Sequence, residues 1–123
     1  MKKPFLLIIT AILYLVLTGG MSLAKESGAE SIEECRQAVT NNPDDSWAHF
    51  NLGNAYGELG VYKEAIESYK QAIRIDPDFA LAHYNLGGAY LQSNDRDSAI
   101  DQYKILKKLD TERANKLFDR IYK

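Results

Sequence analysis

The 123-residue sequence contains a single cysteine, and this scarcity sets the first limits on the protein. One thiol cannot form a disulfide within the chain, and it cannot supply the paired cysteines of a structural zinc site. The sequence also lacks the patterns of a nucleophile elbow, a phosphate-binding loop or a metal-binding motif. We therefore expect no enzyme activity, no cofactor and no metal.

Positive charge is too unevenly distributed for a nucleic-acid binder, because such proteins need a continuous basic face. Residues 25–101 carry 6 basic and 14 acidic side chains, whereas residues 102–123 carry 7 basic and 3 acidic ones. The basic final segment could steer an acidic partner. A solvated helix with favourable charges near its C-terminus explains the same pattern.

Residues 1–24 have the three parts of a secretory signal peptide. Lys2 and Lys3 give a basic start, residues 5–17 form an apolar run interrupted only by one threonine, and residues 22–24 (SLA) form a small-x-small cleavage pattern. As a helix, the apolar run would be about 20 Å long, shorter than the roughly 30 Å hydrocarbon layer of a membrane. The sequence therefore predicts export.

An uncleaved anchor is the alternative interpretation of this segment. No charge occurs over residues 4–24, so this stretch could span the inner membrane with Lys2 and Lys3 inside. In both cases residues 25–123 are expected outside the cytoplasm, with the bacterial periplasm as the first prediction.

The rest of the chain is dominated by an internal repeat. A shift of 34 residues places residues 46–79 on residues 80–113 and pairs identical amino acids at 12 positions. The most conspicuous match is NLGNAY against NLGGAY. A fixed period of this length indicates a stacked repeat architecture.

Each repeat contains two apolar patterns at helical spacing. Gly60 lies between the two patterns of the first repeat, where a positive φ is needed, and Asn94 takes its place in the second. Pro43 and Pro77 follow predicted helix ends. Each repeat is therefore predicted to be two antiparallel helices joined by a tight turn.

Aspartates and glycines add two local predictions. Asp44, Asp45 and Asp78 are placed to cap the helices that follow them. Gly53 and Gly87 lie inside predicted helices, where glycine costs up to about 1 kcal/mol relative to alanine. Because that cost is repeated, we expect close helix–helix approach at both positions.

The segments around the two repeats complete the predicted organisation. Residues 25–30 are expected to be a linker, and residues 31–45 match the second half of a repeat. Cys35 aligns with Tyr69, an inward position, so we expect a buried thiol. Residues 111–123 form an amphipathic pattern that predicts a capping helix.

The repeated residues resemble the tetratricopeptide repeat (TPR) family. Its 34-residue pattern of Leu-Gly, Tyr, Ala, an aromatic residue and Pro is present over residues 46–79 and, without the closing Pro, over residues 80–113. His49 and His83 replace the family's leading Trp. The resemblance implies an all-α fold, a short right-handed α-solenoid of about two and a half repeats plus the C-terminal capping helix.

The resemblance also implies a concave groove, lined by the first helix of each repeat, that holds a peptide or protein. Aromatic residues beside asparagines suit such a site. The predicted partner-binding residues are Trp47, Phe50, Asn51, Asn54, Leu81, Tyr84, Asn85 and Leu91. The alternative is that the protein's own packing covers these side chains.

The predicted function is therefore an exported protein-interaction module or scaffold. Two alternatives remain from the sequence: a structural subunit that acts through self-association, and a small regulatory or sensory subunit of an envelope complex. The known TPR clamp for chaperone carboxylates needs Lys or Arg where this chain has Phe50 and Tyr84, so that specificity is not expected here.

Overall fold

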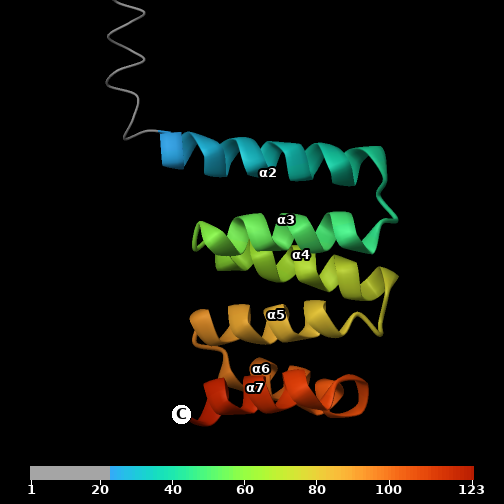
Figure 1. Ribbon diagram of the computed structural model, residues 1–123, viewed down its shortest axis with the longest axis vertical. Helices are drawn as coiled ribbons and strands as arrows, with labels where there is room; N and C mark the ends of the chain where they lie inside the picture. The colour runs from blue at the N-terminus through green and yellow to red at the C-terminus, as the bar shows by residue number, and fades with distance from the viewer. Residues whose placement is uncertain (1–22) are drawn as a thin grey trace, which may run out of the picture.

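The computed structural model describes residues 23–123, with side chains from Ser31 onward, and this part contains six helices and no strand. The all-α prediction is confirmed. The helices follow one another down a single stack (Figure 1). They are α2 (Leu23–Asn41), α3 (Ser46–Glu58), α4 (Tyr62–Ile75), α5 (Ala80–Gln92), α6 (Arg96–Leu109) and α7 (Thr111–Tyr122).

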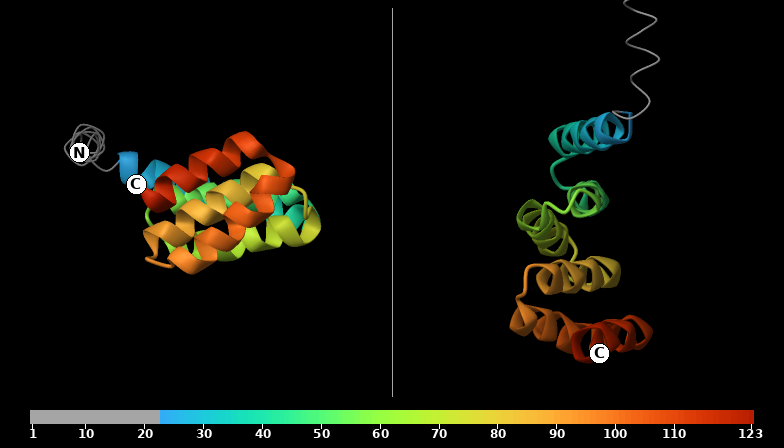
Figure 2. Two further views of the ribbon diagram at one scale, coloured as in Figure 1. Left: turned by 90° about the horizontal axis from the view of Figure 1, so that it is seen from below. Right: turned by 90° about the vertical axis from the view of Figure 1, so that its left-hand side faces the viewer.

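The stack consists of two full helix pairs with one further helix at each end. Helix α3 packs on α4, and α5 packs on α6. Helices α3, α5 and α7 lie on one side of the stack, and α4 and α6 lie on the other (Figure 2). Among the described helices α2 contacts only α3, whereas α7 contacts α5 and α6.

The tight turns and close contacts predicted from glycine are confirmed. Gly60 has φ +73° and Asn94 has φ +60°, so both turns use the left-handed region. A Cβ on Gly53 would lie 2.6 Å from the Tyr69 ring, and a Cβ on Gly87 would lie 2.6 Å from Leu117. Both helices can approach their neighbours only because these side chains are absent.

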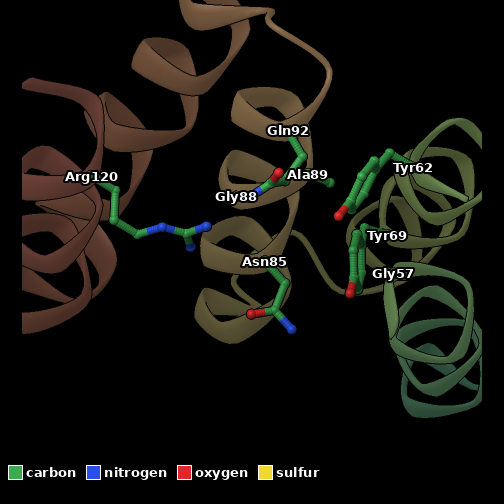
Figure 3. Close-up of a pocket in the computed structure, with 8 residues that line it drawn as sticks. All are labelled: Gly57, Tyr62, Tyr69, Asn85, Gly88, Ala89, Gln92 and Arg120. Carbon is green, nitrogen blue, oxygen red and sulfur yellow. The ribbon is translucent and has the colours of Figure 1, made fainter. Parts of the chain in front are cut away.

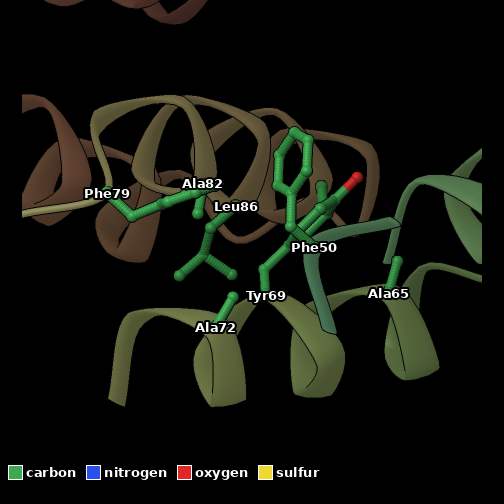
Figure 4. Packing of buried hydrophobic residues seen from close by; sticks show 8 residues of the cluster. Phe50, Ala65, Tyr69, Ala72, Phe79, Ala82 and Leu86 are labelled. Carbon is green, nitrogen blue, oxygen red and sulfur yellow. The ribbon is translucent and has the colours of Figure 1, made fainter. Parts of the chain in front are cut away.

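Two hydrophobic clusters form the core. The first joins α3, α4 and α5 and is rich in alanine and aromatic rings (Figure 4). The second joins α5, α6 and α7 through aliphatic side chains, of which Leu106 and Leu117 are fully buried. The first cluster consists of Phe50, Ala65, Tyr69, Ala72, Phe79, Ala82, Leu86 and Ala89.

The two histidines fasten the loops that precede their helices. His49 Nε2 donates a hydrogen bond to the Pro43 carbonyl oxygen at 2.8 Å, and His83 Nε2 donates to the Pro77 carbonyl at the same distance. His83 is buried, and its other ring nitrogen lies 2.7 Å from Gln102 Oε1. The histidines are therefore core and loop-binding residues.

Three local predictions are wrong. Residues 25–30, expected as a linker, belong to α2; Gly28 alone costs only about 1 kcal/mol and does not end a helix of good helix formers. Asp45 caps α3, but Asp44 and Asp78 do not cap the helices that follow them, because Asp45 and Phe79 are the N-caps of α3 and α5. Cys35 is half-buried rather than buried, since no described segment covers that face of α2.

The predicted signal peptide or anchor, residues 1–24, lies outside the described residues except for Leu23 and Ala24, which belong to α2. Within residues 23–123 no helix has both the length and the apolar character needed to cross a membrane.

Candidate functional site

The side of the stack formed by α3, α5 and α7, here called the groove face, contains a cavity of about 210 Å³. Two tyrosines of α4 reach it from one side of α5, and an arginine of α7 reaches it from the other (Figure 3). The lining residues are Gly57, Tyr62, Tyr69, Asn85, Gly88, Ala89, Gln92 and Arg120.

Asn54 organises the α3 side of this cavity. Its Oδ1 accepts a hydrogen bond from the Tyr69 hydroxyl at 2.7 Å and another from Asn85 Nδ2 at 2.9 Å. Burial raises the pKa of the Tyr69 phenol above its ordinary value, so the hydroxyl stays a donor. Three helices are thereby joined at one amide, and the Asn85 oxygen points toward the side of α5 on which Arg120 lies (Figure 3).

Arg120 lies across α5 because residue 88 has no side chain. A Cβ on Gly88 would lie 2.7 Å from Arg120 Nη1. The guanidinium carbon is 5.7 Å from the centre of the Tyr84 ring, within cation–π range. None of the ion pairs between described side chains includes Arg120.

Helix α7 gives the groove face a positive wall. Arg113, Lys116 and Arg120 follow one another at spacings of three and four residues, so they lie along one side of the helix. Arg113 pairs with Asp110, and Lys116 pairs with Glu112 at 2.7 Å. Arg120 is thus the member of the three with its charge available to a ligand.

A second hollow of about 350 Å³ lies at the N-terminal ends of α3 and α5. Trp47 lines it with a side chain that is 55% exposed, and its ring packs edge-on against Phe79 with centroids 4.7 Å apart. Leu81 and Arg113 line the same hollow. Trp47 is therefore an exposed aromatic group beside the groove face.

The predicted groove residues have different fates in the structure. Trp47 and Asn51 are exposed, and Asn54 and Asn85 meet at the cavity. Phe50 is only 4% exposed and packs on Tyr69 and Phe79, so its prediction as an accessible anchor is wrong. The remaining predicted residues are half-buried, and each packs against one of the two core clusters: Leu81, Tyr84 and Leu91.

Arg120 lines the cavity but is not among the groove residues predicted from the sequence. Tyr62 was also missed. One signal was present: Gly88 aligns with Asn54, and the loss of a side chain at a repeated position marks a place where something else must fit. No group of three or more His, Cys, Asp or Glu side chains that could hold a metal ion occurs within the described residues.

Sequence comparison identifies three matched segments. Residues 58–94 match a TPR repeat family, and residues 34–67 and 80–112 each match a tetratricopeptide repeat family. Together these segments run from residue 34 to residue 112, more than half of the chain. No match was found among curated proteins.

Solved structures share the fold. The TPR2B domain of yeast Sti1 in a pHsp70 complex aligns with a TM-score of 0.71 and 22% identity, over 89% of this chain and 90% of that one. The first TPR of Spaghetti (RPAP3), bound to the HSP90 peptide SRMEEVD, aligns with a TM-score of 0.73 and 18% identity, over 89% and 88%.

MamA also aligns, with a TM-score of 0.65 and 25% identity, over 71% of this chain. The match covers 51% of the MamA chain, so this protein spans about half the length of that relative. At these identities the structural likeness concerns the fold, and the solenoid architecture predicted from the repeat is confirmed by it.

Proposed function

Since the chain belongs to the tetratricopeptide repeat family, we propose that its groove face binds an extended peptide segment of a partner protein. TPR domains are protein-interaction modules, and the neighbours above include domains solved with HSP90 or pHsp70 partners. The proposal extends that kind of binding to the cavity between α3, α5 and α7. Its mechanism is passive recognition on a preformed surface.

The observation that carries the proposal is the position of Arg120. Its guanidinium has no ion-pair partner among the described side chains, and it borders a cavity that also contains Asn85 and Tyr62. A guanidinium presents several donors in a planar fork that suits a carboxylate. Asn85 can accept or donate to a peptide backbone. An acidic segment fits this arrangement best.

The surrounding charge supports an acidic partner. Arg113 and Lys116 stand on the same side of α7, and residues 102–123 carry a net charge of +4. Positive potential along one wall would speed the approach of an acidic segment and weaken at high salt. Trp47 and Leu81 offer apolar contacts at the other end of the groove face.

A peptide-binding measurement tests the proposal. The fluorescently labelled peptide SRMEEVD serves as an acidic probe, with SRMQQVN, amidated at its C-terminus, as the match that lacks carboxylates. We expect the acidic peptide to bind roughly tenfold tighter. Arg120→Gln should remove most of that difference, whereas Arg96→Gln, an exposed arginine at the α6 end, should leave it unchanged. Equal affinity for the two peptides would contradict an acidic preference.

The natural partner needs a separate experiment. Affinity capture with the wild-type chain and with the Arg120→Gln variant, followed by mass spectrometry, should identify proteins retained by the first and lost by the second. The variant changes one exposed side chain, so its helical content should match the wild type by circular dichroism. A partner retained equally by both chains binds elsewhere.

We also propose that the protein acts outside the cytoplasm. The basic start, the apolar run over residues 5–17 and the small-x-small pattern at residues 22–24 support export. The mass of the chain recovered from bacterial cells tests whether the segment is removed. A chain that starts near Lys25 indicates cleavage, whereas one that retains Met1 in the membrane fraction indicates an anchor.

A further inference from the structure

The two ends of the stack are opposite halves of the repeated helix pair. Helix α2 aligns with α4, the second helix of a pair, and α3 covers only one of its faces. Helix α7 follows α6 as α5 follows α4, so it has the place of a first helix. The two free ends lie at opposite extremes of the stack (Figure 1).

The face of α2 that no described segment covers carries residues whose equivalents in α4 are buried. A shift of 34 residues places Ser31 on Ala65 and Ala38 on Ala72. Ala65 and Ala72 are fully buried in the first core cluster, whereas Ser31 and Ala38 are exposed. Between them Cys35, in the place of Tyr69, is half-buried. If the first helix of a pair packed on this face, it would bury Ser31, Cys35 and Ala38.

Helix α7 shows the complementary vacancy. The N-caps Phe79 of α5 and Asp110 of α7 are 31 residues apart, so Leu117 takes the place of Leu86, and Phe118 takes the place of Gly87. Gly87 is buried, because α5 packs between α4 and α6. Phe118 is 42% exposed and Tyr122 is 50% exposed. These rings stack on each other with centroids 4.5 Å apart and form an aromatic patch.

The sizes of two side chains also match across the ends. In the first pair Gly53 has no side chain because the Tyr69 ring occupies that space. The same alignments give Phe118 in place of Gly53 and Cys35 in place of Tyr69. A larger residue on α7 thus meets a smaller residue on α2, which keeps the total volume near that of the native pair.

Charge favours the same arrangement. Glu33 and Glu34 are exposed on α2. At the other end Arg96 lies over the Tyr122 ring at 4.9 Å, and Lys107 lies over the Tyr103 ring at 5.7 Å. Opposite charges attract unlike ends, and like charges oppose the pairing of two α2 helices or two α7 helices.

We propose that α2 of one copy packs on α7 of a second copy and completes a helix pair, so that copies associate head to tail. The contact is heterologous, because each copy uses a different surface at each end. It adds a self-association surface that is separate from the groove face. In the contact, Cys35 of one copy lies against Phe118 of the next, as Tyr69 lies against Gly53. It also lies next to Asp119, which takes the place of Asn54, the partner of the Tyr69 hydroxyl.

Cross-linking of two distinguishable full-length chains tests the proposal. The first chain keeps its native Cys35. The second chain combines Cys35→Ala with Asp119→Cys and carries a size tag; Asp119 pairs only with Lys123 at the exposed end of α7, so its loss leaves the core intact. After mixing, a short bismaleimide is added, and the products are separated on a denaturing gel.

Head-to-tail packing predicts that the mixed dimer exceeds either homodimer by roughly tenfold. A control second chain with Cys35→Ala and Ser93→Cys, on the exposed α5–α6 turn, should show no such excess. Adding Tyr122→Ser to the Asp119→Cys chain should reduce the mixed dimer to the control level, with unchanged circular dichroism. A mixed dimer at the control level overturns the proposal.

The remaining outcomes are equally decisive. A dominant Cys35 homodimer means that two α2 helices pair with each other, and the proposal fails. A Cys35 that resists even a monofunctional maleimide at dilutions where the protein is monomeric means that another part of the same chain covers α2, and the proposal fails as well. Neither result bears on peptide binding at the groove face.

Discussion

The two full helix pairs share their repeated residues but fill their cores in different ways. The α3–α4 pair packs Phe50 and Tyr69 around small alanines, whereas the α5–α6 pair and α7 bury Leu106 and Leu117. Ala72 and Leu106 occupy the same position in the two repeats. The same arrangement of helices therefore accepts large core side chains at different positions in the two repeats, as long as smaller side chains lie opposite them.

The same contrast shapes the groove face. Asn54 in the first repeat holds Tyr69 and Asn85, whereas Gly88 at the equivalent position makes room for Arg120. One repeat uses the position to fix the scaffold, and the other uses it to present a charge. Duplicated positions can thus be divided between structure and recognition.

The largest expected loss of stability comes from a substitution in the second hydrophobic cluster. Leu106→Ala should destabilise the protein by about 2–5 kcal/mol, because it removes a fully buried side chain and leaves a cavity. The reciprocal change Ala72→Leu should cost about 1–3 kcal/mol through overpacking. Urea unfolding followed by circular dichroism measures both. If the two changes were harmless, the repeats would not have distinct packing.

The substitution of alanine for the repeated glycines should have the next largest effect on stability. Gly53→Ala puts a Cβ against the buried Tyr69 ring, and overpacking of this kind costs about 1–3 kcal/mol. Gly87→Ala meets the end of the Leu117 side chain, which can change rotamer. Because alanine also gains about 1 kcal/mol of helix propensity, Gly87→Ala should be close to neutral. Equal losses in urea unfolding would argue against this difference.

The histidines of the two repeats differ in how deeply they are buried, and their removal should therefore differ in its effect on stability. His83→Ala should cost about 1–3 kcal/mol, since it removes a buried ring and leaves Gln102 and the Pro77 carbonyl, which make part-buried hydrogen bonds, without their partner. His49→Ala should cost less, because the Pro43 carbonyl is exposed and water can replace the ring. Thermal unfolding of the two variants side by side gives the comparison. A larger loss for His49→Ala would contradict it.

The smallest expected loss of stability comes from a substitution at the N-cap of α7, and the start of α5 provides the comparison. The Arg113 backbone N–H and then its side chain hold the pKa of Asp110 below its ordinary value. A carboxylate with a lowered pKa stabilises the fold above its unfolded-state pKa, and this contribution is lost as the pH falls through the folded-state pKa. Asp110→Asn should therefore lower the melting temperature at neutral pH by an amount that shrinks toward acid pH.

Asp78→Asn provides the control for that titration, because Asp78 caps no helix. Its melting temperature should follow the wild type at every pH. An Asp110→Asn gap that stays constant into acid pH would show that the loss does not depend on the charge of Asp110, and would contradict the prediction.

The repeat predicted the architecture because its signals are local. Gly60 and Asn94 marked the turns, since a positive φ depends only on the backbone around one residue. Gly53 and Gly87 marked close approach to another helix, since the same unfavourable residue occurs at the same place in both repeats. The structure agrees at all four positions. The solenoid follows from them once the period is known.

The burial of a side chain, and the place that a long side chain extends to, were harder to predict. Helical spacing predicts that the Phe50 side chain points toward the groove. Whether that side chain is exposed depends on the Phe79 ring at the start of α5, which covers it. Arg120 has the sequence setting of a solvated residue, and its long side chain reaches the cavity through a vacancy on another helix. Contacts between distant segments leave no periodic trace in the sequence.

The bond between His83 and the Pro77 carbonyl has a consequence for how the molecule unfolds. The same buried ring also meets Gln102, so one side chain spans the α4–α5 loop and α6. Asn54 joins α3, α4 and α5 in a similar way. Neither pair can open without breaking bonds that belong to the other. The two pairs should therefore lose structure in one cooperative transition, which the lone Trp47 at the first pair reports for both.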